Sequence, residues 1–114
     1  MKRFISSTKH ALRGMRYAFT GRNFQIQAII AIIVIDIALY VQISKIEWLF
    51  VLIAIGLVLS LEATNSALEE ICNKFHPETH PHIALIKDLA AGAVLIASVT
   101  ALAIGLMIFF PYFF

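Results

Sequence analysis

Charged residues are scarce in this sequence of 114 residues. Asp, Glu, Lys and Arg make up only 14% of it, against about 25% in a typical globular protein. Apolar residues make up 61%, against about 45–50%. If the apolar runs are long enough to span a bilayer, this composition excludes a soluble globular protein and indicates an integral membrane protein. The length allows one domain at most, so we predict a single domain over residues 1–114.

Other absences exclude several functions. A single cysteine, Cys72, excludes an internal disulfide and a CxxC site. The net charge of +2 is too small to indicate nucleic-acid binding. No G-x-x-x-x-G-K-[ST] motif is present, so any nucleotide site is not a P-loop. The residues before Phe24 lack the apolar segment and cleavage site of a secretory signal peptide.

Three apolar stretches are long enough to cross a membrane, which requires about 20 residues. We predict spanning helices over about residues 24–43, 47–64 and 83–110 of an all-α fold. The second helix continues beyond the membrane to about Lys74, and the prolines at 77 and 81 end it. Ser44 to Glu47 is predicted to form a tight turn between the first two spans.

Small and polar residues within the spans suggest contacts between helices. Gly56 and the run from Ala90 to Ala93 are predicted points of close helix packing. Asp36 is expected to face the bundle interior or to find a partner, because an ionisable group in a membrane is costly. Packing against a hydroxyl of a neighbouring helix is favoured over a catalytic role, since no second polar group accompanies Asp36 on its helix face.

The N-terminal segment is basic and amphipathic. Residues 4–19 are predicted to form a helix lying on the membrane surface, with Ser6, Ser7 or Thr8 as its N-cap. The alternative is a plain positive flank that sets the topology. Six basic residues precede the first span and place the N-terminus in the cytoplasm: Lys2, Arg3, Lys9, Arg13, Arg16 and Arg22. The segment from 65 to 86 then also faces the cytoplasm.

Acidic and amide side chains follow the second span directly. Glu62, Asn65, Ser66, Glu69 and Asn73 fall on one face of a helix. Carboxylates suit Mg²⁺, a nearby lysine such as Lys87 suits a polyphosphate, and a glutamate just inside the membrane could accept a proton from a lipid hydroxyl. The alternative is a solvated helix end without chemistry.

The loop after this helix contains His76, His80 and His82. Their spacing could bind a transition metal, but prolines separate them and no Cys or HExxH partner is near. A structural loop or a weak headgroup contact is the favoured interpretation. Cys72 is interpreted as a small packing residue.

Two motifs resemble those of the prokaryotic diacylglycerol kinase family, which includes the undecaprenol kinases. They are Glu62-x-x-Asn65-Ser66-Ala67-x-Glu69 and, at the family's usual distance, Lys87-Asp88-x-Ala-Ala-Gly-Ala-Val-Leu95. The Arg22-Asn23-Phe24 stretch and the His-Pro loop are more similar to the undecaprenol kinase branch. The resemblance covers about residues 8–111.

The resemblance implies a homotrimer of three-span subunits, each with an N-terminal surface helix, in the plasma or inner membrane. It implies active sites between neighbouring subunits, ATP with Mg²⁺ as phosphate donor, and a membrane lipid alcohol as acceptor. Glu62 would be the general base, with Asn65 holding the geometry beside it. Glu69 would be a metal ligand, Lys87 would contact the nucleotide phosphates, and Asp88 would contact the nucleotide or its neighbours.

Three further residues are assigned on the same basis. Asn73 and Arg16 are predicted to contact the nucleotide, and Ser66 the lipid substrate. The sequence departs from the family at Gly21, where a glutamate usually supplies a second metal ligand, and at Gln27, which is often Glu or His. At the position of Asn73, the family often has an aspartate.

The predicted function is phosphorylation of undecaprenol or diacylglycerol in lipid recycling. The loss of the glutamate at Gly21 leaves open an alternative, a weakened or inactive relative that acts as a non-enzymatic membrane protein. A small transporter or channel subunit, suggested by Asp36 within a span, is a third hypothesis. The groove between the first and third spans would suit either lipid, so the sequence does not identify the lipid.

Overall fold

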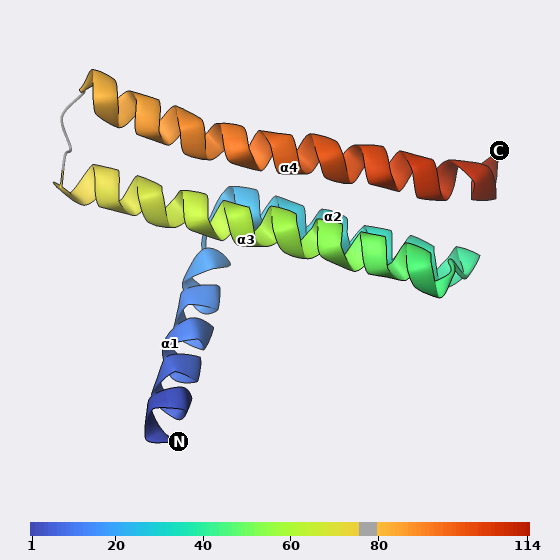
Figure 1. Cartoon of the computed structure of the whole chain (residues 1–114), viewed down its shortest axis with the longest axis horizontal. Helices are drawn as coiled ribbons and strands as arrows, with labels where there is room; N and C mark the ends of the chain where they lie inside the picture. The colour runs from blue at the N-terminus through green and yellow to red at the C-terminus, as the bar shows by residue number, and fades with distance from the viewer. Residues whose placement is uncertain (76–79) are drawn as a thin grey trace.

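Four α-helices form the fold in the computed structural model, which describes residues 1–75 and 80–114. They are α1 (Lys2–Ala18), α2 (Arg22–Val41), α3 (Lys45–Phe75) and α4 (Pro81–Phe113). The predicted all-α fold with three spans and an N-terminal helix is confirmed. Figure 1 shows α2, α3 and α4 alongside one another, with α1 running across their direction.

Helix α2 has the length of a bilayer core. Its 20 residues extend over about 30 Å, which equals the typical hydrocarbon thickness of about 30 Å. Helix α2 starts two residues before the predicted start at residue 24 and ends two residues before the predicted end at residue 43. Gly21 caps its N-terminus, and Gln42 takes a left-handed conformation (φ 58°) after its last turn. The chain then reverses into α3.

The predicted turn from Ser44 to Glu47 is wrong, because Lys45 already begins α3. Ser44 and Glu47 instead form a reciprocal cap. The Glu47 backbone N–H donates to Ser44 Oγ (3.2 Å), and the Ser44 N–H donates to Glu47 Oε1 (2.9 Å). Both bonds satisfy backbone donors that a helix start leaves unpaired.

Helices α3 and α4 are longer than the bilayer is thick. Their 31 and 33 residues extend over about 46 and 50 Å. The α2–α3 turn lies at one end of the bundle, and the last turn of α3 and the first turn of α4 lie at the other, so the excess length of both helices projects there (Figure 1). Helix α4 continues through Pro111 and ends two residues later, at Phe113. Because Pro111 lies in the last turn, little backbone hydrogen bonding is lost there.

The best-packed part of the chain lies near the α2–α3 turn. Ala38, Ile43, Val51 and Ile108 form its buried cluster. Elsewhere most large apolar side chains face outward, as a lipid-facing surface requires. Helix α3 packs most extensively along α4, then against α2, and least against α1.

Two predictions about the spans do not hold within the single chain. Asp36 is exposed on α2 and does not face the interior of the described bundle. A Cβ built at Gly56 or at Gly92 meets no atom within 4 Å, so neither glycine is a point of close packing between these helices. Both glycines and Asp36 therefore lie on surfaces that a neighbour or lipid can cover.

Helix α1 begins earlier than predicted. Lys2 is its first residue, so Ser6, Ser7 and Thr8 lie inside the helix and do not cap it. Thr8 Oγ1 donates to the Phe4 carbonyl (2.9 Å) within the same helix. At its other end, Gln25 Nε2 of α2 donates to the Phe19 carbonyl (2.7 Å), which fixes the bend from α1 into α2.

Candidate active site

A buried carboxylate, Glu62, lies at the centre of the polar residues on α3. Its side chain is only 4% exposed. Gln27 of α2 donates from Nε2 to Glu62 Oε1 (3.1 Å), and Asn65 donates from Nδ2 to Glu62 Oε2 (3.3 Å). Each carboxylate oxygen therefore receives an amide N–H, which compensates part of the cost of burying a charge.

Asn65 connects this carboxylate to the next one along the helix. It is 6% exposed, and its Nδ2 also donates to Glu69 Oε1 (3.1 Å). Glu62 lies about 26 Å from the start of α3 and Glu69 about 36 Å, on the helical rise of 1.5 Å per residue. If α3 enters a hydrocarbon core of about 30 Å at its first residue, Glu62 would lie just inside the apolar layer and Glu69 beyond it.

A small cleft lies beside Glu69, where the α1–α2 bend meets α3. Its volume is about 160 Å³. The lining residues are Tyr17, Ala18, Thr20, Gly21, Ser66, Glu69, Glu70 and Asn73. Tyr17 Oη donates to Glu70 Oε2 (3.3 Å), which joins α1 to the polar face of α3. Ser66, predicted to contact the lipid, lies in this polar cleft.

The structure brings together only some of the residues that the sequence predicts to contact the nucleotide. Lys87 Nζ of α4 donates to Asn73 Oδ1 of α3 (2.6 Å), across 14 residues of sequence. Asn73 also lines the cleft beside Glu69, so Lys87 and Glu69 approach the same region. Asp88 and Arg16 are exposed, and within the described residues no side-chain hydrogen bond joins either to this cluster.

His80 and His82 have a structural role at the start of α4. His80 caps α4, its Nδ1 accepting from the His82 backbone N–H (3.1 Å). The two imidazole rings stack with centroids 5.6 Å apart. His76 lies outside the described residues. Cys72 is buried on α3, as expected of a packing residue.

The donor chemistry beside Glu69 suits a hard cation. Within residues 1–75 and 80–114 no group of three His, Cys, Asp or Glu side chains is placed to hold a metal. Glu69 and Glu70 nevertheless line one cleft, and Mg²⁺ commonly takes only one or two protein carboxylates together with phosphate oxygens and water. These residues therefore fit a metal that arrives with a nucleotide.

Comparison with known proteins agrees with this arrangement. Residues 9–109 match the family model described as prokaryotic diacylglycerol kinase. The chain belongs to the prokaryotic diacylglycerol kinase family. With three helices long and apolar enough to cross a bilayer, this family member is a multi-pass membrane protein.

Several curated relatives carry kinase names. The undecaprenol kinase of Bacillus subtilis is 40% identical over 112 residues, covering 97% of this chain and 91% of the relative. The diacylglycerol kinase of Synechocystis is 35% identical, covering 94% of this chain and 62% of the relative. The diacylglycerol kinase of Haemophilus influenzae is 32% identical, covering 82% and 80%. The similarity therefore extends over nearly the whole chain.

Sequence reasoning did not predict the contact between Gln27 and Glu62. Gln27 was noted only as a departure from the family, although it is one of few polar residues in the first span. The contact joins residues 35 positions apart and depends on how α2 packs against α3. The contact between Tyr17 and Glu70 was missed in the same way, because it depends on where α1 bends, although Glu70 itself was considered as a metal ligand beside Glu69.

Proposed function

We propose that this chain is a lipid kinase that transfers the γ-phosphoryl group of ATP to a membrane lipid alcohol, undecaprenol or diacylglycerol, in lipid recycling. The observation that carries the proposal is the position of Glu62. Glu62 is buried where the apolar run of α3 ends, and Asn65 connects it to Glu69 two helical turns further along. A lipid hydroxyl and a water-soluble nucleotide would meet at this boundary. The kinase names of the relatives support the same reaction.

In the proposed reaction, Glu62 accepts the proton of the lipid hydroxyl as that oxygen attacks the γ-phosphorus. The alcohol O–H bond breaks, an O–P bond forms, and the bond from the γ-phosphorus to the ADP oxygen breaks. Gln27 and Asn65 hold the carboxylate in place through its two oxygens. Positioning of this kind is the main contribution of a protein to phosphoryl transfer.

The nucleotide side of the site would lie in the cleft beside Glu69. Glu69, with Glu70 next to it, would hold Mg²⁺, which neutralises phosphate charge when bound. Lys87, which donates a hydrogen bond to Asn73, would contact phosphate oxygens. Asp88 and Arg16 remain proposed nucleotide contacts, and Ser66 a proposed contact of the lipid head.

We further propose that the N-terminus and this site face the cytoplasm, where ATP is found. The basic residues before α2 support that orientation. A homotrimer with sites shared between neighbouring subunits is proposed from the family resemblance. The outward apolar surfaces of α2, α3 and α4 leave room for such contacts.

A second candidate function, a binding protein without turnover, is favoured by Gly21. This glycine lines the cleft beside Glu69, so the α1–α2 bend contributes no carboxylate there. Titration with ATP and Mg²⁺ discriminates among the outcomes. Nucleotide binding that depends on Glu69, together with turnover, supports the kinase, whereas binding without turnover supports the second candidate.

The kinase proposal is tested by transfer of ³²P from ATP to undecaprenol and to dioleoylglycerol in mixed micelles. Wild-type protein should phosphorylate at least one lipid. Glu62→Gln should lower kcat by about 10²-fold or more, the usual contribution of a general base. Glu69→Gln should raise the Mg²⁺ concentration needed for activity. Absence of transfer to either lipid with Mg²⁺, Mn²⁺ and Co²⁺ would refute the proposal.

A further inference from the structure

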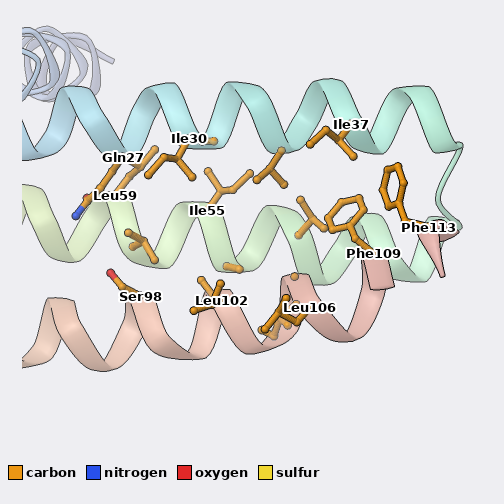
Figure 2. A pocket seen from close by; sticks show the side chains of 18 residues that line it. Gln27, Ile30, Ile37, Ile55, Leu59, Ser98, Leu102, Leu106, Phe109 and Phe113 are labelled. Carbon is orange, nitrogen blue, oxygen red and sulfur yellow. The ribbon is translucent and has the colours of Figure 1, made fainter. Parts of the chain in front are cut away.

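Two hollows between the helices differ in chemical character. The larger, of about 480 Å³, runs between α2 and α4 along the face of α3, and only Gln27 and Ser98 of its lining carry polar side chains (Figure 2). The smaller, of about 160 Å³, is the cleft beside Glu69, which shares no lining residue with the larger one. Of these two hollows, only the cleft is lined by charged side chains, those of Glu69 and Glu70.

The two carboxylates of the cleft are not balanced by a cation in its lining. The lining includes hydroxyl and amide groups but, among the described residues, no lysine, arginine or histidine. Lys87 approaches from α4 but donates to Asn73 and not to Glu69 or Glu70. Two like charges on consecutive residues repel each other, so the cleft favours a divalent cation.

Each carboxylate of the cleft is held through one oxygen. Glu69 Oε1 accepts from Asn65 Nδ2 (3.1 Å), and Glu70 Oε2 accepts from Tyr17 Oη (3.3 Å). The other oxygen of each accepts no side-chain hydrogen bond from the described residues. Carboxylates that bind metals are typically oriented in this way by a hydrogen bond from an outer partner. Asn65 and Tyr17 have the position of such partners.

The two carboxylates differ in what orients them. Glu69 and Asn65 belong to the same helix, so α3 alone determines their geometry. Glu70 points about 100° around α3 from Glu69, and its partner Tyr17 comes from α1, 53 residues away. The direction of the Glu70 carboxylate therefore depends on where α1 lies.

Helix α1 is attached to the rest of the chain at its last turn. Ala18 is its only buried residue. The bond from Tyr17 to Glu70 is the one side-chain hydrogen bond between α1 and α3 among the described residues. Figure 1 shows α1 running across the direction of the other helices from this point. The contact that holds α1 to α3 is thus also the contact that orients Glu70.

We infer that Tyr17 positions Glu70 as the second carboxylate ligand of the cation in this cleft, and that cation binding is thereby coupled to the docking of α1. Tyr17 holds Oε2 of Glu70 and leaves Oε1 to the cation. Tyr17 is a positioning residue, because it acts on the cation only through Glu70. The inference rests on the proposed function for the presence of Mg²⁺ with the phosphate donor.

The test is a titration with Mn²⁺ alone, without ATP or lipid acceptor, in neutral detergent micelles. Electron paramagnetic resonance of the free ion gives the dissociation constant, and Mn²⁺ prefers the same oxygen ligands as Mg²⁺. Tyr17→Phe should weaken Mn²⁺ binding by about tenfold, the lower end of the loss that follows removal of an outer partner. Tyr40→Phe is the matched control.

Tyr40→Phe removes the same hydroxyl from an exposed tyrosine near the other end of α2, far from the cleft. It should bind Mn²⁺ within about twofold of wild type. Absence of Mn²⁺ binding by wild-type protein would overturn the inference. Unchanged binding by Tyr17→Phe would do the same, and tighter binding would show that Tyr17 competes with the cation for Glu70.

Glu70→Gln separates positioning from packing. This variant should bind Mn²⁺ about tenfold or more weakly, and adding Tyr17→Phe should change the constant by less than about twofold, because Tyr17 acts through the carboxylate. A purely structural role of Tyr17 would leave its effect undiminished in the Glu70→Gln background. That result would refute the assignment of Tyr17.

Hydrogen exchange tests the coupling to α1. Near Tyr17, the Thr20 and Gly21 amides donate to the Tyr17 and Ala18 carbonyls (3.0 and 3.1 Å) and close the α1–α2 bend. Because coupling is reciprocal, saturating Mn²⁺ should slow their exchange by up to the same factor of about ten in wild type. Exchange should not respond in Tyr17→Phe. The first turn of α1 is the internal control and should not respond in either protein.

Exchange at Thr20 and Gly21 that does not respond to Mn²⁺ in wild-type protein would refute the coupling. Because neither ATP nor lipid acceptor is present, all these results are independent of turnover. A protein that shows the Tyr17 dependence but transfers no phosphoryl group fails only as a kinase. One that phosphorylates lipid without this dependence fails only the present inference.

Discussion

Gly21 is the residue at which the metal side of the proposed site is least complete. It caps α2 and lines the cleft that also contains Glu69 and Glu70. Its backbone (φ −78°, ψ 136°) is extended, a conformation open to any residue. A Cβ built there lies 3.4 Å from the Ala18 carbonyl oxygen, an ordinary contact. A larger side chain is therefore compatible with the local fold.

Gly21→Glu should lower the Mg²⁺ concentration for half-maximal activity by about 3–10-fold. The added carboxylate would enter the cleft beside Glu69 and supply an oxygen donor to the cation. The measurement is lipid phosphorylation as a function of free Mg²⁺ at saturating ATP.

Gly21→Gln is the control, since it adds a side chain of the same size without charge. It should leave the Mg²⁺ requirement unchanged or raise it. If Gly21→Glu required as much Mg²⁺ as wild type, the metal would not lie beside residue 21.

The helical spacing of Glu62, Asn65 and Glu69 was sufficient to predict that they lie on one face, and hydrogen bonds join them in the structure. Their burial was not predictable in the same way. Glu62 is buried because α2 brings Gln27 against it, and this contact depends on the packing of two helices. Periodicity places residues on a face, but it does not determine which neighbour covers that face.

At the scale of elements, one hydrogen-bonded cluster ties the first turn of α3 to the last turn of α4. Glu47 completes the reciprocal cap with Ser44, and it also accepts a hydrogen bond from Tyr112 Oη (2.5 Å), 65 residues away. The same carboxylate thus starts α3 and holds the last turn of α4. The sequence indicated only an aromatic interfacial end at this position.

Tyr112→Phe and Glu47→Gln should each lower the apparent unfolding temperature in detergent, Glu47→Gln by more, because it weakens the cap as well as the link to α4. Fluorescence of Trp48, the only tryptophan, reports the transition. The double variant should lose less than the sum of the single losses, since Tyr112→Phe removes the bond that Glu47→Gln weakens. Strictly additive losses would show that the Tyr112–Glu47 bond contributes no stability.

Helix boundaries were predicted within about three residues throughout, but the residues that cap the helices were not predicted correctly. The N-cap predicted for α1 was wrong because no local signal marked the true start at Lys2. Ser44 and Glu47 follow the spacing of a capping box, which explains why a helix begins at the predicted turn. Helix α3 ends at Phe75, next to the predicted end at about Lys74, and Pro81 is the first residue of α4.

At the scale of the whole molecule, the single chain leaves much of its apolar surface and one acid uncovered. Asp36 is exposed on α2, about 8 Å along the axis from its end at Val41. An acid is costly in lipid unless it finds a polar partner or reaches the interface. The proposed trimer would offer such a partner, which composition alone could not identify because it lies on another chain.

Mixed oligomers can test whether active sites are shared between subunits. Lys87 contacts Asn73 of its own chain, and Asn73 lies one helical turn beyond Glu69. Lys87 can therefore complete the site of its own chain or that of a neighbour. Glu62→Gln and Lys87→Ala should each be nearly inactive alone.

If a site takes Glu62 from one subunit and Lys87 from the next, equal co-expression of the two variants should restore roughly a quarter of wild-type activity in randomly mixed cyclic trimers. The restored fraction arises because half of the subunits retain each residue, and both must meet at one interface. Isolation of the mixed oligomers with affinity tags of two kinds should raise the restored fraction to about a third, because each mixed cyclic trimer contains one such interface among its three. Mixed oligomers that remain inactive would show that each chain builds its own site. Such a result would agree with the hydrogen bond between Lys87 and Asn73 of the same chain.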